Sequence, residues 1–332
     1  MNKYLKSIGL TAFSIVLGSL GTASFANAKT QISIGSCPVG CTAYTWSAGI
    51  ADVINRNVSE VNVTAEETKG YVANVKLLNS GDLEVAMATT LSSYGAYVAK
   101  GAYAGGKPGQ ILSWLSIAPV AMHVITLEGG PVNSLADLKG KRVGMGQPGG
   151  TSMLDAEILL DTIGLKPGED FKDFRVKLPA MVDMLKDGQI DAFMWNGSIP
   201  LPPIIKLKAS HDIRFLSIPS EVSDTIRAKY AAYSEGDLPA NTYPDQAASI
   251  PSYRLGNVLL IRADVPEEIV YQATKTVLEN LDHMGTVHPA WKRVSTDSIL
   301  GGFNAPLHPG ALRYYREANV PGIEEFVART SN

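Results

Sequence analysis

A glycine-rich stretch near the middle of the chain has the composition of an anion-binding loop. Residues Val143–Met145 predict the end of a strand, and the run Gly146–Gly150 cannot continue it. Thr151-Ser152 then offers an N-cap for a helix beginning at Met153. A strand that leads through glycines into a helix gathers backbone N–H groups at one point, where the helix dipole adds positive potential. The stretch therefore predicts a site for a carboxylate or a phosphate.

The same residues contain the letters of a dinucleotide fingerprint, with glycines at 144, 146 and 149. That motif needs an acidic residue at the end of the next strand. Here Glu169 and Asp170 come before that strand, which we predict at Phe174–Leu178. No Gly-Lys-Ser/Thr follows the glycines either, so a phosphate P-loop is not indicated. Taken alone, the motif favours a structural turn that binds nothing.

The arrangement occurs twice, however. Residues Ile32–Thr42 again predict a strand, a glycine loop, a small hydroxyl and a helix. Residues Leu77–Met87 and Met184–Met194 each predict a helix end, a glycine stop and an alternating strand, at nearly the same offset from the loops. Two similar α/β units therefore follow one another along the chain. One ligand held between two lobes explains the repeated loops better than two unrelated turns.

The N-terminus has the pattern of a secretory signal peptide, residues 1–28. Lys3 and Lys6 precede the apolar run Ile8–Leu20, and Ala26-Asn27-Ala28 is a small-residue cleavage site. We expect a periplasmic protein whose mature chain begins at about Lys29. Removing the two lysines leaves 27 basic and 32 acidic residues, a net charge of −5. Mild acidity gives no support for nucleic-acid binding.

Short strands that alternate with helices favour an α/β fold with parallel sheets. We expect Ile111–Ile117 and Val120–Leu127 to be separate strands, divided by Ala118-Pro119, and Pro266–Met284 to be one long helix. Lobe 1 is predicted at 29–120 and 256–332 and lobe 2 at 121–255, with hinge crossings near 118–121 and 251–256. In open sheets of this kind, ligands bind beyond the carboxyl ends of the strands. The ends that we expect to meet at one cleft are 36–42, 67–71, 89–90, 147–152 and 195–198.

Several motifs, in this order along the mature chain, resemble the TAXI family of substrate-binding proteins of TRAP transporters. They are Ser134–Val143, Gly149-Gly150-Thr151, Lys186–Phe193, Asn241-Thr242-Tyr243-Pro244 and Leu307–Tyr315. The resemblance implies a bilobed periplasmic-binding-protein fold, type II-like, with two α/β lobes joined by a hinge. It implies a monomeric receptor, neither an enzyme nor a cofactor protein, that captures a small carboxylate such as 2-oxoglutarate or glutamate. The receptor would deliver that ligand to TRAP membrane subunits driven by an ion gradient.

The resemblance also assigns candidate ligand contacts to both lobes. From lobe 1 they are Ser36, Gly40, Thr42, Tyr44, Lys69, Tyr71, Thr89 and Thr90; from lobe 2 they are Gln147, Gly149, Gly150, Thr151, Ser152, Trp195 and Asn196. The chain departs from the family where Cys37, Cys41 and Lys69 replace common glycines, and Thr89-Thr90 replaces a polar pair with an amide. These departures leave the identity of the ligand open. Lys69 favours an acid, unless Glu66 or Glu67 pairs with it.

Other chemistry has less support in the sequence. Cys37 and Cys41 can form a short-range disulfide in an oxidising compartment or remain a free pair. The five histidines are scattered and lack the spacing that zinc favours, so we expect no metal site. No Gly-x-Ser-x-Gly elbow supports a serine hydrolase. The alternatives that stay open are a binding protein of an ATP-driven importer and an exported α/β enzyme.

Overall fold

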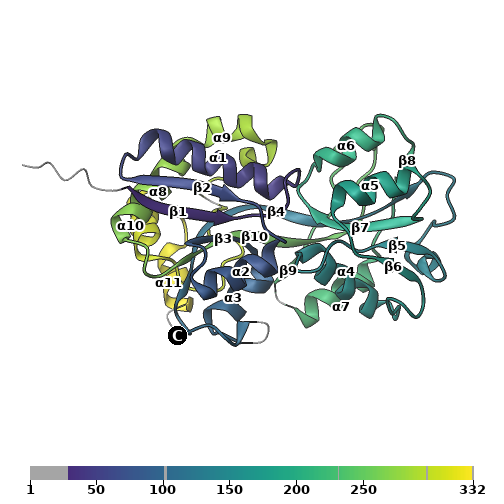
Figure 1. Cartoon of the computed structure of the whole chain (residues 1–332), viewed down its shortest axis with the longest axis horizontal. Helices are drawn as coiled ribbons and strands as arrows, with labels where there is room; N and C mark the ends of the chain where they lie inside the picture. The colour runs from purple at the N-terminus through teal and green to yellow at the C-terminus, as the bar shows by residue number, and fades with distance from the viewer. Residues whose placement is uncertain (1–28, 101–102, 231, 297, 331–332) are drawn as a thin grey trace, which may run out of the picture.

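The computed structural model describes residues 29–100, 103–230, 232–296 and 298–330. The predicted signal peptide, residues 1–28, lies outside the described residues. The elements form two groups at the two ends of the long axis of the molecule, and strands β4 (Ile111–Leu127) and β10 (Tyr253–Arg262) run between the groups (Figure 1).

The first group contains a β-α-β-α-β unit. Its elements are β1 (Thr30–Gly35), α1 (Thr42–Asn57), β2 (Val61–Glu66), α2 (Tyr71–Ser80) and β3 (Val85–Thr89). Strand β1 pairs in parallel with both β2 and β3. Helix α1 covers one face of these strands and α2 the other (Figure 1). Helix α2 stops at Gly81, whose φ of +86° is the left-handed conformation that glycine adopts without strain.

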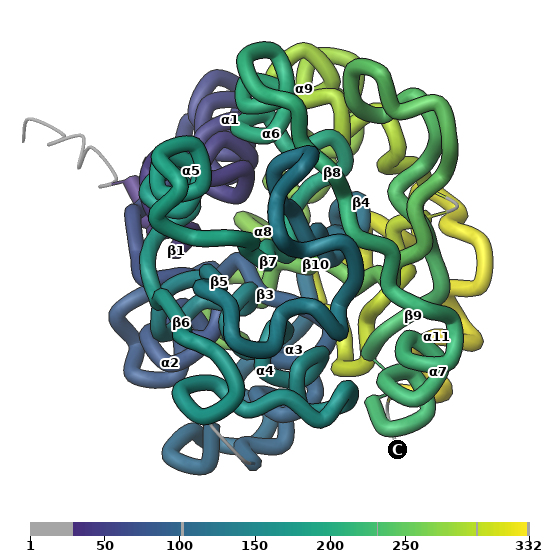
Figure 2. The backbone as a smooth tube through the Cα atoms, turned by 90° about the vertical axis from the view of Figure 1, so that its right-hand side faces the viewer, coloured from purple at the N-terminus to yellow at the C-terminus, as the bar shows by residue number. Residues whose placement is uncertain are grey.

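The second group contains the same unit again. Its elements are β5 (Arg142–Gly144), α4 (Thr151–Thr162), β6 (Lys172–Phe174), α5 (Leu178–Lys186) and β7 (Ala192–Gly197). Strand β5 lies in parallel between β6 and β7, and α4 and α5 lie on opposite sides of these strands (Figures 1 and 2). The predicted internal repeat is therefore present. The predicted strand Phe174–Leu178 is wrong in its position, because β6 ends at Phe174 and α5 already begins at Leu178.

The two units are joined by antiparallel strands at the centre of the sheet. The strand order is β2-β1-β3-β10-β4-β7-β5-β6. Strand β10 pairs antiparallel with β3 and β4, and β4 pairs antiparallel with β7. The expectation of wholly parallel sheets is wrong at this centre, because periodicity predicts strands but not their direction. Parallel pairing holds within each unit.

Strand β4 is continuous, so the predicted break at Ala118-Pro119 is wrong. The register of β4 against β10 shifts between the pairs Leu255–Val120 and Asn257–Ile117, which places Pro119 at an irregularity of the ladder. A proline cannot donate to a ladder, and a bulge is one of the places where a strand accommodates it. The predicted lobe boundaries fall inside β4 and β10 and stay a prediction.

The remaining elements complete both groups. They are α3 (Thr90–Tyr97), η2 (Leu135–Leu138), α6 (Pro202–Lys208), β8 (Ile213–Phe215), α7 (Ser220–Lys229), β9 (Tyr233–Glu235), α8 (Glu267–Glu279), α9 (Leu281–Val287), η3 (Pro289–Arg293), α10 (Pro309–Glu317) and α11 (Ile323–Thr330). The predicted helix Pro266–Met284 is two helices, because Asn280 leaves the helical conformation with φ −117° and ψ 27°.

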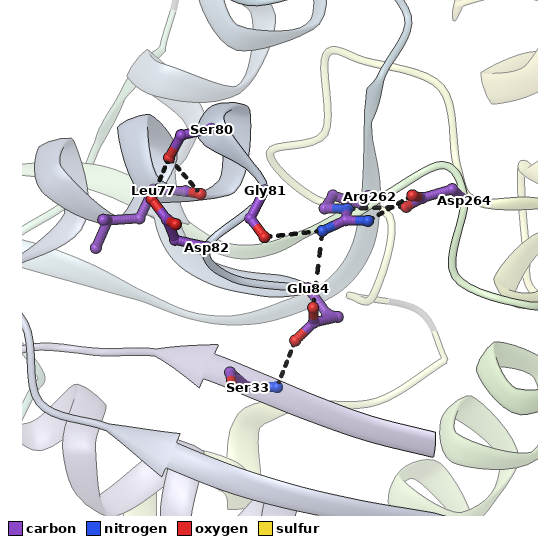
Figure 3. A network of polar contacts seen from close by, with 8 residues as sticks. All are labelled: Ser33, Leu77, Ser80, Gly81, Asp82, Glu84, Arg262 and Asp264. Carbon is purple, nitrogen blue, oxygen red and sulfur yellow. Dashed lines mark hydrogen bonds and ion pairs between the residues drawn. The ribbon is translucent and has the colours of Figure 1, made fainter.

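A polar network at the start of β3 connects residues of β1 and β10 (Figure 3). Glu84, just before β3, accepts a hydrogen bond from the Ser33 backbone on β1 at 2.9 Å. Arg262, the last residue of β10, lies 3.7 Å from the Glu84 carboxylate and donates to the Gly81 carbonyl at 3.1 Å. Partly exposed ion pairs add little stability, so the main effect of this network is to hold β1, β3 and β10 in register.

Candidate ligand-binding cleft

The two units face each other across a cleft at the carboxyl ends of their parallel strands. Its cavity has a volume of about 60 Å³. One water molecule needs about 10–15 Å³, so the cleft accommodates a small molecule. The lining residues are Cys37, Pro38, Cys41, Thr42, Ala43, Trp46, Lys69, Gly70, Tyr71, Thr89, Val120, Gln147, Gly150, Thr151, Ser152, Trp195, Asn196, Gly197 and Ser198.

The structure brings most of the candidate contacts to this cleft. The candidates that line it are Thr42, Lys69, Tyr71, Thr89, Gln147, Gly150, Thr151, Ser152, Trp195 and Asn196. Their contact with a ligand stays a prediction.

Five candidates do not line the cleft. Ser36 is fully buried and its hydroxyl bonds to the Ile34 carbonyl, while Gly40 lies at an exposed turn. Tyr44 packs against the main core, and Thr90 lines a separate cavity with its hydroxyl bonded to the Ala232 carbonyl. Gly149 contributes a backbone contact between the units instead.

Glycines let the two units approach closely. A Cβ built on Gly70, whose φ is +117°, would lie 3.0 Å from the Cα of Gly150 in the other unit. Beside them the Gly149 carbonyl accepts from the Ala73 backbone at 3.2 Å, and the Gln147 amide donates to the Lys69 carbonyl at 2.6 Å. These contacts describe a closed arrangement of the two units around the cleft.

The helices α1 and α4 begin at the cleft, with Cys41 and Gly150 as their N-cap residues. The prediction that Thr151-Ser152 caps a helix beginning at Met153 is wrong, because Thr151 is already helical and no side chain caps α4. The Ser152 hydroxyl instead exchanges hydrogen bonds of 3.2 Å with the backbone of Asn196. The Thr42 hydroxyl is 2.9 Å from that of Ser198, a contact between the two units.

Several buried polar atoms of the lining residues have no protein partner. They are Trp46 Nε1, Thr89 Oγ1, Thr151 Oγ1 and Asn196 Oδ1. Buried polar groups are almost always hydrogen-bonded, because an unpaired group loses its interaction with water without compensation. A hydroxyl both donates and accepts, an indole only donates, and an amide oxygen only accepts. A bound molecule with both acceptors and donors would satisfy this set.

Lys69 is the one charged side chain among the described residues that line the cleft. The sequence left open whether a neighbouring glutamate neutralises it. Glu67 pairs instead with Lys177 of the second unit, at 3.1 Å, and no described carboxylate lies within ion-pair distance of Lys69. The lysine charge is therefore available to a ligand.

A buried carboxylate lies behind the cleft. Asp155, on α4, is only 1% exposed and accepts hydrogen bonds from the Tyr253 hydroxyl at 3.0 Å and from the Asn196 amide nitrogen. Burial raises the pKa of Asp155 from 3.8 to about 6. Asp155 is not recognisable as a buried group from the sequence, because an aspartate on an amphipathic helix normally lies in solvent.

Cys37 and Cys41 form a disulfide, with their Cα atoms 6.3 Å apart. This resolves the alternative that the sequence left open. Of the lining residues, only Ala43, Trp46 and Val120 lie outside the five strand-end segments that were expected to converge. Trp46 and Ala43 follow on α1 and Val120 lies in the middle of β4, so the apolar patterns of those elements gave no indication that they border a cleft.

Within the described ranges, no group of three or more His, Cys, Asp or Glu residues is arranged to hold a metal ion. No helix of the described part of the chain has the length and apolar composition to span a membrane.

Comparison with known proteins agrees with this architecture. Residues 34–318 match the NMT1-like family. The chain belongs to the NMT1-like family. It is similar to the alkanesulfonate-binding protein of Xanthomonas axonopodis pv. citri bound to MOPS, with 15% identity, a TM-score of 0.51, and coverage of 92% of this chain and 86% of that one.

Two further solved structures are similar. A protein from Bordetella bronchiseptica RB50 has 15% identity and a TM-score of 0.50, over 91% of this chain and 90% of that one. A putative L-cystine ABC transporter protein from Listeria monocytogenes has 11% identity and a TM-score of 0.48, over 79% of this chain and 95% of that one. The chain has the α/β fold of periplasmic solute-binding proteins, as the sequence analysis expected.

Proposed function

We propose that this NMT1-like protein is the solute-binding component of an importer and captures a small carboxylate between its two units. The observation that carries the proposal is the cleft itself. Equivalent strand ends of two repeated units enclose a small volume in which buried donors and acceptors have no protein partner. A binding protein that closes around its ligand requires this combination of complementarity and enclosure.

The electrostatics of the cleft favour an acid. Lys69 is the one charge among the described lining residues, and α1 and α4 both begin there. Helix starts and an ammonium group attract negative charge. The small volume favours an acid of the size of glutamate or 2-oxoglutarate over a sugar or a peptide. An alkanesulfonate, the ligand named for the Xanthomonas relative, is a further anion to test.

We expect the protein to be a monomer in the periplasm. Its partners would be the membrane subunits of the importer. The TRAP assignment depends on the sequence resemblance alone, since none of the three relatives described above is named as a TRAP receptor. The comparisons support the ATP-driven importer, the alternative of the sequence analysis, better. Uptake of labelled ligand into cells decides between them: dissipating the ion gradient abolishes TRAP uptake, whereas an ATP-driven importer continues while ATP is supplied.

The rival class is an exported enzyme with the same fold. A panel of small acids, sugars and polyamines, scored by thermal shift and followed by mass spectrometry of the recovered compound, separates the classes. A ligand at a hundredfold excess over its Kd stabilises the folded protein by about 2.7 kcal/mol. A receptor raises the melting temperature and returns the acid unchanged. Conversion of the compound to a product contradicts the proposal.

A further inference from the structure

One amide of the cleft is held in a fixed orientation. Asn196, at the end of β7, is 9% exposed and lines the cleft. Its Nδ2 donates to the carboxylate of Asp155 on α4, and its backbone is held by the hydroxyl of Ser152. Its Oδ1 has no protein partner. The oxygen is therefore the amide atom that is left without any protein partner.

The orientation follows from the chemistry of Asp155. An ionised carboxylate only accepts hydrogen bonds, so the amide must present its nitrogen to Asp155 and its oxygen away from it. Tyr253 on β10 donates to the other carboxylate oxygen at 3.0 Å, and Tyr233 on β9 faces the same group. Among the described residues no cationic side chain forms an ion pair with Asp155. Its hydrogen-bond partners, Tyr253 and Asn196, are donors whose positions the carboxylate fixes.

We propose that Asp155 is a positioning residue, which turns the Asn196 amide oxygen toward the cleft and so selects ligands that present an N–H or O–H donor there. The ligand class, which depends on the proposed function, becomes a small acid with an amino or hydroxyl group. The corresponding oxo acid offers only lone pairs to the amide oxygen. A site whose buried polar group is left unpaired rejects an analogue more strongly than one that merely lacks an apolar contact.

Protonation of Asp155 removes the constraint. A protonated carboxyl group donates one hydrogen bond, so the amide can then turn its oxygen toward Asp155 and its nitrogen toward the cleft. Burial raises the pKa of Asp155 to about 6, within the range where this change occurs in mild acid. Burial also raises the pKa of Tyr233 and Tyr253, so both phenols remain protonated donors over that range. Selectivity for the donor-bearing acid should therefore fall below pH 6.

The first test uses the ligand-free protein. In ¹⁵N-labelled protein, the side-chain NH₂ signals of Asn196, assigned by their loss in Asn196→Ser, should shift with a midpoint near pH 6. The shift should disappear in Asp155→Asn and remain in the control Asp161→Asn, an exposed aspartate of the same helix. Signals that do not respond to pH in the wild type overturn the positioning role, whatever the protein binds.

The second test measures discrimination within matched pairs, L-glutamate with 2-oxoglutarate and L-lactate with pyruvate, by calorimetry at pH 8 and pH 5. The wild type should prefer the donor-bearing acid by at least about tenfold at pH 8, and Asp155→Asn should bind both members about equally. Equal binding of a pair by the wild type overturns this inference but leaves the carboxylate receptor intact. If neither pair binds while the Asn196 signals titrate, the carboxylate assignment fails and the positioning of the amide is supported.

Discussion

At the scale of single residues, the cleft combines one unpaired cation with several unpaired hydrogen-bonding atoms. Lys69 carries the charge, and the hydroxyl of Thr151 and the indole of Trp46 are among the unpaired atoms. A lysine ammonium group binds an ionised oxygen more strongly than a neutral amide, whereas a hydroxyl can form a hydrogen bond with either. The two kinds of group therefore determine different properties of the ligand.

The Lys69→Met substitution should weaken the binding of glutamate by about tenfold in Kd, which is roughly 1.4 kcal/mol. Glutamine, which replaces the side-chain carboxylate with an amide, should lose less affinity. Lys76→Met is the matched control, since Lys76 is an exposed residue of α2 outside the cleft lining. Titration calorimetry measures all the affinities. If the affinities for glutamate and glutamine fall equally, Lys69 does not contact the side-chain carboxylate of the ligand.

Asp155 should make the folded protein less stable as the pH rises. Its pKa is 3.8 before folding and about 6 in the folded state, so between these values the folded protein binds more protons than the unfolded chain. Stability is therefore lost as the pH rises through this window, by about 3 kcal/mol in total. The free energies of unfolding of the wild type and of Asp155→Asn can be measured by urea unfolding from pH 3.5 to 7.5. The wild type should lose stability relative to the variant as the pH rises. A difference that is constant or moves the other way contradicts the buried, proton-binding state of Asp155.

Site residues at strand ends could be predicted, because the local sequence pattern shows where each strand ends. Residues that reach the site only through the packing of one element against another could not be predicted. Thr42, Thr151 and Asn196 follow from the repeated strand–loop–helix pattern. Asp155 could not be identified, because only the packing of α4 against β7 and β10 buries it. Ser36 was placed in the cleft because its position follows β1, but the chain turns its side chain into the core.

At the scale of elements, the starts of α1 and α4 are not equivalent. The Thr42 hydroxyl of α1 bonds to Ser198 across the cleft, whereas the Thr151 hydroxyl of α4 has no protein partner. A hydroxyl can make more than one hydrogen bond, so both residues stay predicted ligand contacts. Thr42 contributes to the contact between the units, and Thr151 remains available to a ligand.

The Thr151→Val substitution should weaken the binding of the acid by roughly 1.5–3 kcal/mol, the range for a hydrogen bond to a charged group. The melting temperature of the ligand-free protein should hardly change, because no protein hydrogen bond is lost. Thr42→Val, the matched control, should change affinity less. Calorimetry and thermal unfolding of both variants provide the comparison. Affinity of Thr151→Val equal to that of the parent would show that the start of α4 is structural only.

The elements themselves were predictable within each unit and less so between the units. Alternation and glycine stops located β1 to β3, β5 and β7 with their helices, because each unit is built from local patterns, whereas β6 lies earlier in the chain than predicted. The antiparallel centre was not predictable, since a buried apolar run is the same in either strand direction. Pro119 suggested a break in β4 that the bulge opposite β10 absorbs.

At the scale of the whole molecule, the contacts across the cleft describe a closed form. The Gln147 amide, the Gly149 carbonyl and the Lys177 ammonium each bridge the two units. A ligand enclosed in this way needs an open form in order to enter, and we expect the units to rotate about β4 and β10, the strands at the centre of the sheet. The predicted hinge crossing near 118–121 lies in β4, and the one near 251–256 includes the first residues of β10.

Ligand binding should therefore make the molecule more compact. Small-angle X-ray scattering of the protein refolded without ligand should give a larger radius of gyration than the same protein with saturating acid. The physical reason is that the ligand supplies partners for buried atoms only when both units surround it. Identical scattering with and without a tightly bound acid contradicts the hinge closure.

The central claim is that one small acid binds between the two units, and calorimetric titration of a refolded wild type and a cleft-blocked variant tests it most directly. Gly70→Leu is suitable for blocking, because even a Cβ at this position would lie 3.0 Å from Gly150. Gly164→Leu, another glycine with positive φ but with open space around it, is the control for backbone strain. We expect the wild type and the control to bind a small carboxylate with a stoichiometry of about one, and Gly70→Leu to fold without binding it. Binding that survives in Gly70→Leu, or a wild type that binds a sugar and none of the acids, would contradict the account.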